Sequence, residues 1–391
     1  MKLAILSREP KGYTVRRLVE AAEERGHSAR VLDTLRFSML LEDDGPELFY
    51  SGKRLSTYDA VIPRIGPSIT YYGVTVMRQF EALDAFCLNQ AQAIISARDK
   101  LLSLQLLSSF GVPIPETAFV RDRKDVIGAI ERVGGAPVVI KLLEGSQGVG
   151  VILAETQKIA EAILETLQSA KQNVLVQKFV AESKGRDVRA LVVGDRVVGA
   201  IRRVAQGTEF RSNIHRGGSA EVVDLEPAYR RTALKAARVL GLRVAGVDML
   251  EGKDGPQVME VNASPGLEGI ETATGSDLAG EIVRFIEERQ QIPDIDVRYR
   301  LGLAQGFGVA EVPVLETSSI NNAALQDTDL RDADVVVLSI TRDGDIISSP
   351  RGDTIVKAGD TLLCYGPLKT VRKLLPDRKR GRKKRAPNTR E

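Results

Sequence analysis

The stretch Val258-Met-Glu-Val-Asn-Ala-Ser-Pro-Gly266 carries the most informative pattern of this chain, together with Gly246-Val-Asp-Met-Leu250 shortly before it. Because alternate residues of a strand share one face, Glu260 and Asn262 are predicted to point the same way. A short loop can fold the preceding strand back and present Asp248 beside them. These three oxygen ligands suit Mg²⁺, which keeps positions open for substrate phosphates. The alternative is a hairpin whose polar residues only form its solvated face.

A glycine-rich segment, Glu144-Gly-Ser-Gln-Gly-Val-Gly150, follows a predicted strand that ends at Lys141-Leu142. Its glycines let successive backbone N–H groups approach an anion, as phosphate binding requires. The segment is not a P-loop, because no Gly-Lys-Ser/Thr follows it. Lys141 adds a cation on the strand that leads into the segment. A flexible hairpin tip is the alternative interpretation.

Further basic residues occur where a phosphoryl-transfer enzyme needs them, since the charge of a transferred group is stabilised mainly by positioned cations and metal. They are Lys100, Arg202-Arg203 and Arg211-Ser-Asn213. Each one by itself is typical of a surface cation. The hypothesis is that several of them converge on one site. The sequence indicates no Ser/His/Asp or Cys/His arrangement for a protein nucleophile.

The chain begins with the rhythm of a β-α-β unit, which is typical of an open α/β domain. Apolar runs at Lys2–Ser7 and Ala60–Ile65 flank a helical pattern at Arg16–Arg25. A second helix is predicted over Ala97–Phe110. The prolines of Val112–Pro115 cannot continue that helix, so a domain junction is expected there.

From about residue 117 to 288 short strands are mixed with helices, which predicts an α+β region. Gly194-Asp195 predicts a tight hairpin turn, so the strands on either side pair antiparallel. After a linker at Gln290–Asp296, more short strands predict a small C-terminal domain with its own hairpin. The predicted strands are Val138–Leu142, Val174–Lys178, Arg189–Val193, Val197–Ile201, Gly246–Leu250, Gln257–Val261, Val335–Ile340, Asp345–Ser348 and Thr361–Tyr365, and the helices Asp125–Val133, Ile159–Ser169 and Pro227–Leu240.

Composition excludes several classes of protein. Hydrophobic residues make up 43% and charged residues 27% of the 391 residues, which is the balance of an ordinary globular protein of two or three domains. Cys87 and Cys364 form no Cys-x-x-Cys pair, so neither a disulfide framework nor a zinc site is indicated. The apolar run at the N-terminus is too short for a signal peptide or a membrane span, so a cytoplasmic protein without membrane contact is expected.

The last residues, Asp377–Glu391, form a strongly basic tail. They hold eight Lys and Arg against two acids, so the rest of the chain is net negative although the whole carries +3. A run this basic without apolar residues cannot fold alone, and it would be attracted to phosphate or to an acidic protein surface. The alternative is a solvated tail without a partner.

These motifs resemble the ATP-grasp superfamily and, within it, the RimK family, the ligases that add glutamate to the C-terminus of small-subunit ribosomal protein number six. The resemblance is nearly gap-free from Met1 to about Glu288, and the last of its motifs is highly specific. It rests on Val61-Ile-Pro-Arg-Ile-Gly66, Ala97-Arg-Asp-Lys100, Gly134-Gly-Ala-Pro-Val-Val-Ile-Lys141, Phe210-Arg-Ser-Asn213, His215-Arg-Gly-Gly218 and Met259-Glu-Val-Asn-Ala-Ser-Pro-Gly-Leu-Glu-Gly-Ile270.

The resemblance implies an ATP site assembled from these motifs. Arg203 would steady the transferring phosphoryl group, and with Lys141 it would be the catalytic pair. The family usually has an acid where Lys178 stands, so an adenine contact there would be made by the backbone. The implied nucleotide ligands are Lys100, Lys141, the lid residues Gly145, Ser146 and Gly148, the adenine linker Lys178 and Phe179, Asp187 at the ribose, and Arg211, Ser212 and Asn213; the implied metal ligands are Asp248, Glu260 and Asn262.

The reaction implied by the family is the attack of an acceptor carboxylate on the γ-phosphate of ATP, which gives an acyl phosphate. The amine of L-glutamate then attacks this intermediate and forms an amide. The implied cofactors are ATP and two divalent ions, Mg²⁺ or Mn²⁺. Catalysis would come mainly from positioning and charge stabilisation.

The C-terminal region departs from the plain family architecture and resembles the TrkA-C domain, the regulatory module of potassium-channel gating proteins. The resemblance rests on Val309-Ala-Glu-Val312, Asp329-Leu-Arg331, Arg342-Asp-Gly344 and Thr354-Ile-Val-Lys-Ala-Gly-Asp-Thr-Leu-Leu363. Such modules bind small ligands, nucleotides among them, and often dimerise. A nucleotide effector and a homo-oligomer are therefore expected.

The resulting domain prediction combines an ATP-grasp fold of α/β and α+β parts with a small C-terminal α+β regulatory domain. The expected boundaries are 1–112 for the N-terminal α/β domain, 113–290 for the ATP-grasp domain, 291–300 for a linker, 301–376 for the TrkA-C-like domain and 377–391 for the basic tail.

Two alternatives to a ribosomal-protein ligase stay open. The same nucleotide residues would serve a ligase that acts on another carrier protein or makes short glutamate peptides. In the other alternative, the chain is a ribosome-associated factor that senses a nucleotide and contacts rRNA through its tail.

Overall fold

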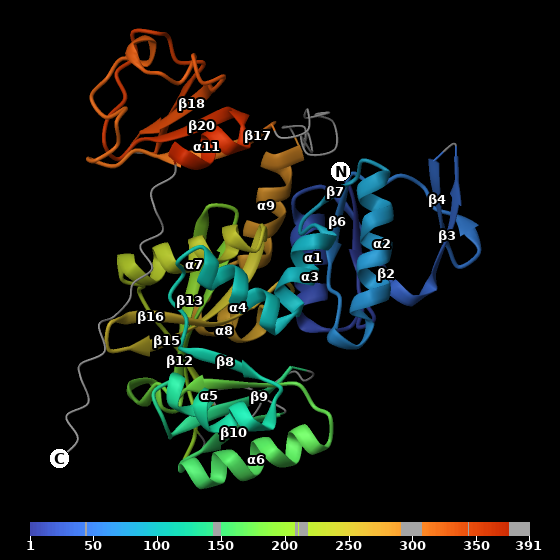
Figure 1. The fold of residues 1–391 in the computed structure, drawn as a ribbon. Coiled ribbons are helices and arrows are strands. Elements are labelled where there is room, and N and C mark those ends of the chain that lie inside the picture. Colours follow the sequence, from blue (N-terminus) through green and yellow to red (C-terminus); the bar gives the residue numbers. More distant parts are fainter. Residues whose placement is uncertain are drawn as a thin grey trace, which may run out of the picture. The chain divides into compact units, whose positions relative to one another are not determined.

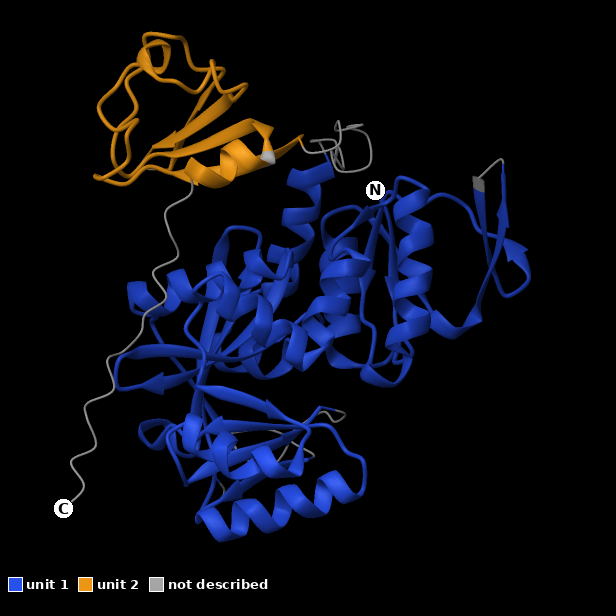
Figure 2. Ribbon diagram, in the orientation of Figure 1, with its two compact units in different colours: residues 1–294 blue, residues 295–391 orange. Residues whose placement is uncertain are grey.

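The computed structural model describes residues 1–43, 45–143, 150–207, 210, 218–290, 307–342 and 344–374. The chain divides into two compact units, Met1–Asp294 and Ile295–Glu391 (Figure 2). Within the described ranges, no helix combines the length and the apolar character that crossing a membrane requires.

The first unit begins with a parallel sheet of strand order β2-β1-β6-β7, so the expected open α/β domain is confirmed. Apolar runs at β1 and β6 are buried, because both strands lie in the middle of this sheet. An antiparallel excursion, β3-β4-β5, was not predicted. The elements are β1 (Lys2–Leu6), α1 (Tyr13–Glu24), β2 (Ser28–Leu32), β3 (Phe37–Glu42), β4 (Gly45–Tyr50), β5 (Lys53–Arg54), β6 (Ala60–Pro63), α2 (Thr70–Ala82) and β7 (Phe86–Cys87).

The helix predicted over Ala97–Phe110 is wrong in its extent, because the chain forms two helices there. α3 spans Ala91–Arg98 and α4 spans Lys100–Ser109. Asp99 separates them, since its backbone is extended and its side chain accepts a hydrogen bond from the Leu102 N–H at 2.9 Å. This N-cap interaction stabilises the start of a new helix.

Two antiparallel sheets follow in the first unit, as Figure 1 shows, which confirms the α+β region. The first has the order β10-β9-β11-β8 and a core of its own with α5 and α6. Its elements are β8 (Thr117–Val120), α5 (Val126–Arg132), β9 (Val138–Leu142), β10 (Val151–Ala154), α6 (Gln157–Ser169) and β11 (Val174–Lys178).

The second antiparallel sheet has the order β14-β13-β12-β15-β16. The predicted hairpin at Gly194 joins β12 to β13, and the residue has φ +63, a conformation that favours glycine. Its elements are β12 (Arg186–Val193), β13 (Arg196–Val204), β14 (Ser219–Val222), α7 (Pro227–Val239), β15 (Val244–Gly252), β16 (Gly255–Asn262), α8 (Glu268–Thr274) and α9 (Leu278–Gln290).

A buried amide joins the N-terminal sheet to this five-stranded sheet. Asn89, which follows β7, is 1% exposed. Its Nδ2 donates to the carbonyl oxygens of Val244 and Ala263, both at 2.8 Å. Its Oδ1 accepts from the backbone N–H groups of Arg243 at 2.9 Å and Val244 at 3.1 Å. The side chain thus satisfies four backbone groups at the start of β15 and the end of β16.

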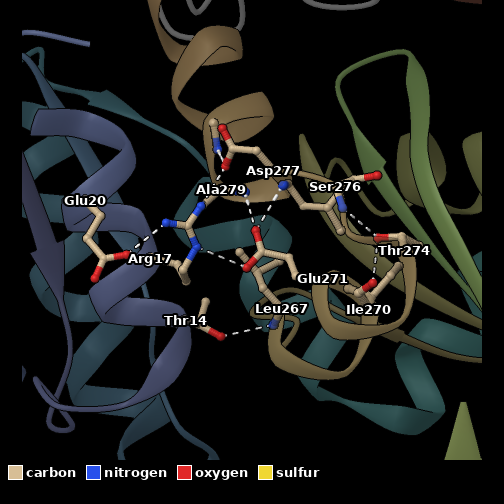
Figure 3. Close-up of polar contacts among 12 residues, drawn as sticks. Thr14, Arg17, Glu20, Leu267, Ile270, Glu271, Thr274, Ser276, Asp277 and Ala279 are labelled. Atoms are coloured by element: carbon tan, nitrogen blue, oxygen red, sulfur yellow. Dashed lines mark hydrogen bonds and ion pairs between the residues drawn. The ribbon is translucent and has the colours of Figure 1, made fainter. Parts of the chain in front are cut away.

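A second set of polar contacts fixes α1 against α8 and α9 (Figure 3). Arg17 binds Glu271 at 3.4 Å and Asp277 at 2.9 Å. Oε1 of Glu271 also accepts from the backbone N–H groups of Leu278 at 2.9 Å and Ala279 at 3.0 Å, at the start of α9. The acid therefore bonds to free N–H groups of one helix and to a cation of another.

The second unit contains an antiparallel sheet of order β17-β20-β18-β19. Asp360 is 2% exposed, and both of its oxygens accept from Arg342, at 2.8 and 2.7 Å. The hydrogen bonds from Arg342 lower the pKa of Asp360 despite the opposing effect of burial. The elements are β17 (Phe307–Pro313), β18 (Val336–Arg342), β19 (Asp345–Ser348), β20 (Thr361–Pro367) and α11 (Leu368–Leu374).

Replacement of Asn89 by Ala is expected to lower the free energy of unfolding by about 3 kcal/mol or more, because it leaves buried donors and acceptors without partners. Urea unfolding followed by circular dichroism measures this, since the chain has no tryptophan. The matched control is Gln90→Ala, whose side chain makes no capping bond to α3. An equal loss in both variants would contradict the role of Asn89.

Candidate active site

One face of the five-stranded sheet carries a row of charged side chains. Strand pairing places Arg203 of β13 opposite Asp187 of β12, and Arg189 of β12 opposite Asp248 of β15. Asp248 is in turn opposite Glu260 of β16. Asp187 and Arg189 share a face because they are two residues apart. The register therefore lines up five charged groups from four neighbouring strands.

Four of these groups form a charge-balanced network, in which Arg189 is half-buried and the other three are buried. Arg189 donates to Asp248 through Nε at 2.7 Å and Nη2 at 2.6 Å. Arg203 contacts the same carboxylate at 2.9 Å and binds Asp187 in bidentate fashion, with Nε at 2.7 Å from Oδ1. Asp187 is 0% exposed, and Asp248 and Arg203 are each 3% exposed. Two carboxylates and two guanidiniums neutralise one another, which is the condition for burying such charges.

The network favours the ionised forms of Asp248 and Arg203, whereas burial raises the pKa of Asp187 despite its contacts with Arg203. Burial acts to raise the pKa of Asp248, but Arg189 and Arg203 outweigh it and hold the pKa below its usual range. Burial likewise disfavours the charge of Arg203, yet Asp248 and Asp187 raise its pKa above the ordinary value. Nη1 of Arg203 has no hydrogen-bond partner among the residues that the structure describes. A permanently cationic guanidinium therefore keeps one nitrogen for a ligand.

The three predicted metal ligands lie together at the edge of this row. Asp248 and Glu260 are direct cross-strand neighbours, and Asn262 follows Glu260 on the same face of β16. A register shift interrupts the pairing of β15 with β16 between Asp248 and Met249, and the pairing resumes at Met249 opposite Val258. Glu260 is exposed, and in the described part of the chain its carboxylate has no hydrogen-bond or ion-pair partner.

This donor set fits a hard divalent cation. Two carboxylates and one amide oxygen are the ligand types that Mg²⁺ takes in proteins. Asp248 accepts three hydrogen bonds, so its two oxygens, with about four acceptor positions, keep one for a ligand. Across the described ranges, no group of three or more His, Cys, Asp and Glu side chains could hold a metal.

Two lysines from other elements belong to the electrostatic surroundings of Glu260. Lys141 is the fourth residue of β9, and Lys100 is the first residue of α4. Nζ of Lys100 donates to the Leu143 carbonyl at 3.0 Å, just before the glycine-rich segment. Burial lowers the pKa of Lys141 to about 8; Glu260 opposes this shift and Lys100 adds to it. The bond from Lys100 to Leu143 joins α4 to the end of β9, and the carboxylate of Glu260 on β16 is near enough to influence the pKa of Lys141.

Other predicted nucleotide residues have contacts of their own. Nζ of Lys178 binds Glu116 at 2.6 Å and is exposed, and Phe179 is partly buried. Both carboxylate oxygens of Asp187 accept hydrogen bonds from Arg203. The contact of Asp187 with the ribose therefore stays a prediction. The predicted lid residues Gly145, Ser146 and Gly148, and Arg211, Ser212 and Asn213, lie outside the described residues.

The structure differs from the sequence-based prediction at four arginines: one predicted candidate binds elsewhere, and three near the site were not predicted. Arg202 belongs to a different contact, because it binds Glu251 at 2.7 and 3.2 Å. Arg189 was missed, although its spacing of two from Asp187 gave a signal for a shared face. Arg64 and Arg98 lie within motifs that resemble the family, but the sequence indicated no role for either residue.

Comparisons with known proteins agree with this geometry. Residues 1–94 match the RimK PreATP-grasp domain, 97–286 the RimK-like ATP-grasp domain and 309–376 the TrkA-C domain. A Rhodopirellula baltica protein named probable alpha-L-glutamate ligase is 57% identical over 97% of this chain and 94% of its own length. A Hahella chejuensis protein named probable alpha-L-glutamate ligase 1 is 57% identical over 74% of this chain and 96% of its own.

Solved structures are similar in fold. A RimK domain protein of Sphaerobacter thermophilus has a TM-score of 0.56 and 25% identity, over 73% of this chain and 100% of that one. The ATP-grasp ligase PsnB, complexed with a precursor variant, Mg and ADP, has a TM-score of 0.59 and 23% identity, over 74% and 98%. This chain therefore belongs to the RimK family of ATP-grasp ligases, and it carries a TrkA-C domain in its C-terminal part.

Proposed function

We propose that this ligase joins L-glutamate to the C-terminal carboxylate of a protein acceptor, small-subunit ribosomal protein number six. The single observation that carries the proposal is the pairing of Asp248 with Glu260 beside the cationic Arg203. Relatives named probable alpha-L-glutamate ligase support the choice of glutamate. Such an acceptor places the work of the enzyme in the cytoplasm.

The chain's residues divide the work of phosphoryl transfer among them. Bound ATP with two Mg²⁺ or Mn²⁺ ions supplies the phosphoryl group and neutralises part of its charge. Asp248, Glu260 and Asn262 would hold the metal. Lys100 and Lys141 would orient the phosphates, and Nη1 of Arg203 would face the charge that develops during transfer. Asp187 and Asp248 hold Nε and Nη2 of this guanidinium in place. The group therefore needs no reorganisation during the reaction.

No protein nucleophile is needed in the proposed reaction. The acceptor carboxylate attacks the γ-phosphorus, the bond to ADP breaks, and an acyl phosphate forms. The free amine of glutamate then attacks the acyl carbon, so phosphate leaves and a proton is released. The site holds cations and carboxylates rather than a Ser or Cys with an adjacent base, which agrees with this direct route.

Loss of a metal ligand is expected to abolish ligation. Glu260→Gln and Asp248→Asn should each lower kcat by about 100-fold or more, because the charge of the transferred group loses its counterion. Mass spectrometry of the acceptor after incubation with ATP, Mg²⁺ and glutamate reads the number of added glutamyl residues.

The matched control for this experiment is Asp254→Asn, at the exposed turn of the same hairpin. It should leave the yield unchanged. In a reaction without glutamate, added hydroxylamine should convert the acyl phosphate of the acceptor into a hydroxamate. If Glu260→Gln still modified the acceptor at the rate of the unaltered enzyme, the metal assignment would be overturned. If the unaltered enzyme modified only free glutamate or short peptides, the acceptor would be wrong.

The pH dependence of kcat/KM for ATP should report Lys141. The pKa of this group is lowered to about 8, so it loses its proton as the pH rises through about 8. Because only the cation attracts phosphate, kcat/KM should be constant well below pH 8 and fall above it. Lys141→Arg should remove this alkaline limb, since arginine keeps its charge there.

The control for the pH profile is Lys158→Arg, at an exposed position of α6. Its profile should match that of the unaltered enzyme. An alkaline limb that persists unchanged in Lys141→Arg would assign the limb to another group.

The C-terminal unit would regulate the ligase rather than complete it. Relatives that match only 74% of this chain are themselves covered over 96% of their length. A ligase of this family is therefore whole without a TrkA-C domain. We propose domain boundaries at 112, 290, 300 and 376, a nucleotide effector for the TrkA-C domain, contact of the basic tail with rRNA or an acidic surface, and a homo-oligomer assembled through the C-terminal unit.

Removal of residues 295–391 should preserve ligation and abolish regulation. The truncated enzyme should keep kcat within about 2-fold, because the catalytic charges all lie in the first unit. Its mass by light scattering should fall to that of a monomer, and added nucleotides should no longer alter its rate. An unchanged assembly state together with an unchanged nucleotide response would contradict the proposal.

A further inference from the structure

Arg64 lies where α/β sheets bind their ligands. It follows β6 directly, and its backbone N–H donates to the Leu6 carbonyl at 2.9 Å, at the end of β1. Both strands end at the same edge of the parallel sheet. From β1 the chain moves outward to β2 and then returns to β6, so the strand order reverses between β1 and β6. Ligands of open α/β sheets bind outside the carboxyl ends of strands at such a point.

Arg98 is held beside the same segment. It is the last residue of α3, and its Nη2 donates to the Ile65 carbonyl. Nη1 of Arg64 donates to the Pro265 carbonyl at 2.7 Å, in the loop after β16. The loop that follows the metal-binding strand therefore joins the arginine pair. Pro265 follows the predicted metal ligand Asn262 by three residues, so the bond from Arg64 places the pair near the metal ligands, and Glu260 favours the charge of Arg98.

This arginine pair lacks the counterions that the sheet network has. Neither guanidinium forms an ion pair with a carboxylate within the part of the chain that the structure describes. Nε of Arg98 is buried without any hydrogen-bond partner. Glu9 favours the charge of Arg64 but makes no ion pair with it. Arg203, by comparison, is 3% exposed and binds two carboxylates, whereas Arg64 and Arg98 are half-buried and bind none in the described ranges.

The unpaired charges have an energetic cost. Burial, with repulsion from Arg98, lowers the pKa of Arg64 to about 10. Burial also lowers the pKa of Arg98. Two like charges that are partly removed from water without an acid destabilise a protein, and an anion that joins them relieves this cost. The arrangement is therefore complete only with an anionic ligand.

We propose that Arg64 and Arg98 form the subsite that binds a carboxylate of the incoming L-glutamate. This inference rests on the proposed function. The reacting carboxylate of the acceptor is a poor match, because two guanidiniums would withdraw the electron density that it needs as a nucleophile. Glutamate reacts through its amine and keeps two carboxylates that require cations. A guanidinium fork binds a carboxylate in two parallel hydrogen bonds.

Steady-state kinetics of Arg64→Lys and Arg98→Lys test the subsite. Each variant keeps the charge and loses the fork, so KM for glutamate should rise about 10- to 100-fold, the effect of one or two charge-assisted hydrogen bonds. KM for ATP and KM for ribosomal protein number six should stay within about 2-fold. The control is Arg78→Lys, an exposed arginine of α2. Thermal unfolding of each variant shows whether it is folded.

Analogues of glutamate that lack one carboxylate test the same subsite by changing the ligand instead of the enzyme. L-glutamine lacks the side-chain carboxylate, and L-isoglutamine lacks the α-carboxylate. The unaltered enzyme should discriminate against one of them, and this discrimination should disappear in the arginine variants. Loss of discrimination is a change that general damage to the fold would not produce.

Other patterns of KM would overturn the subsite. A rise confined to KM for ATP would assign the arginines to phosphate, and one confined to KM for the acceptor would assign them to its carboxylate. Calorimetric titration of L-glutamate into the enzyme with ADP and Mg²⁺ needs no acceptor. Binding that is lost in Arg64→Gln would support the subsite even if the acceptor were wrong. Glutamate binding unchanged in Arg64→Gln would refute the subsite alone, and no glutamate binding by the unaltered enzyme would refute both proposals.

Discussion

The charge-balanced network of Asp187, Arg203, Asp248 and Arg189 is the constraint on which the site depends. These residues occupy one end of a sheet face whose other end is apolar and covered by α8 and α9. Without mutual neutralisation, charges this deeply buried would destabilise the sheet by several kcal/mol, and removal of one partner typically costs about 3–5 kcal/mol. The network thus permits ionised groups inside the protein and also fixes their direction. Glu260, at its edge, is left for a ligand.

Local patterns in the sequence correctly predicted the structural features that depend only on residues close together in the chain. The alternation of Glu260 and Asn262 and the turn at Gly194 were correct, because period and turn chemistry act over a few residues. The network was not predictable, since it requires that β12 lies between β13 and β15, which strand order alone decides. The division of one predicted helix at Asp99 was missed for a different reason: helical periodicity continues through a residue whose side chain caps the next helix.

The residues of the candidate site are supported by different hydrophobic cores. Side chains of the N-terminal sheet and of the five-stranded sheet share continuous cores, so Arg64, Arg98 and the metal ligands have one common support. Lys141 belongs to the sheet of β8–β11, which packs around a core of its own. The groups proposed for glutamate and metal therefore keep a fixed mutual geometry. Lys141, which is proposed to bind phosphate, belongs to a part that is stabilised independently.

The sequence motif at the end of β16 is highly specific for the family, and its contacts give a physical explanation. Asn262 shares a face of β16 with Glu260, and the backbone then leaves the strand toward the N-terminal sheet. Gly246, opposite Asn262, has no room for a side chain, because a Cβ there would lie 2.9 Å from Pro265. The next residues each bond to a different partner: the Ala263 carbonyl to Asn89, the Ser264 hydroxyl to the Pro63 carbonyl, and the Pro265 carbonyl to Arg64. A substitution in this loop would therefore disturb the proposed metal ligands, the junction between the sheets and the arginine pair together.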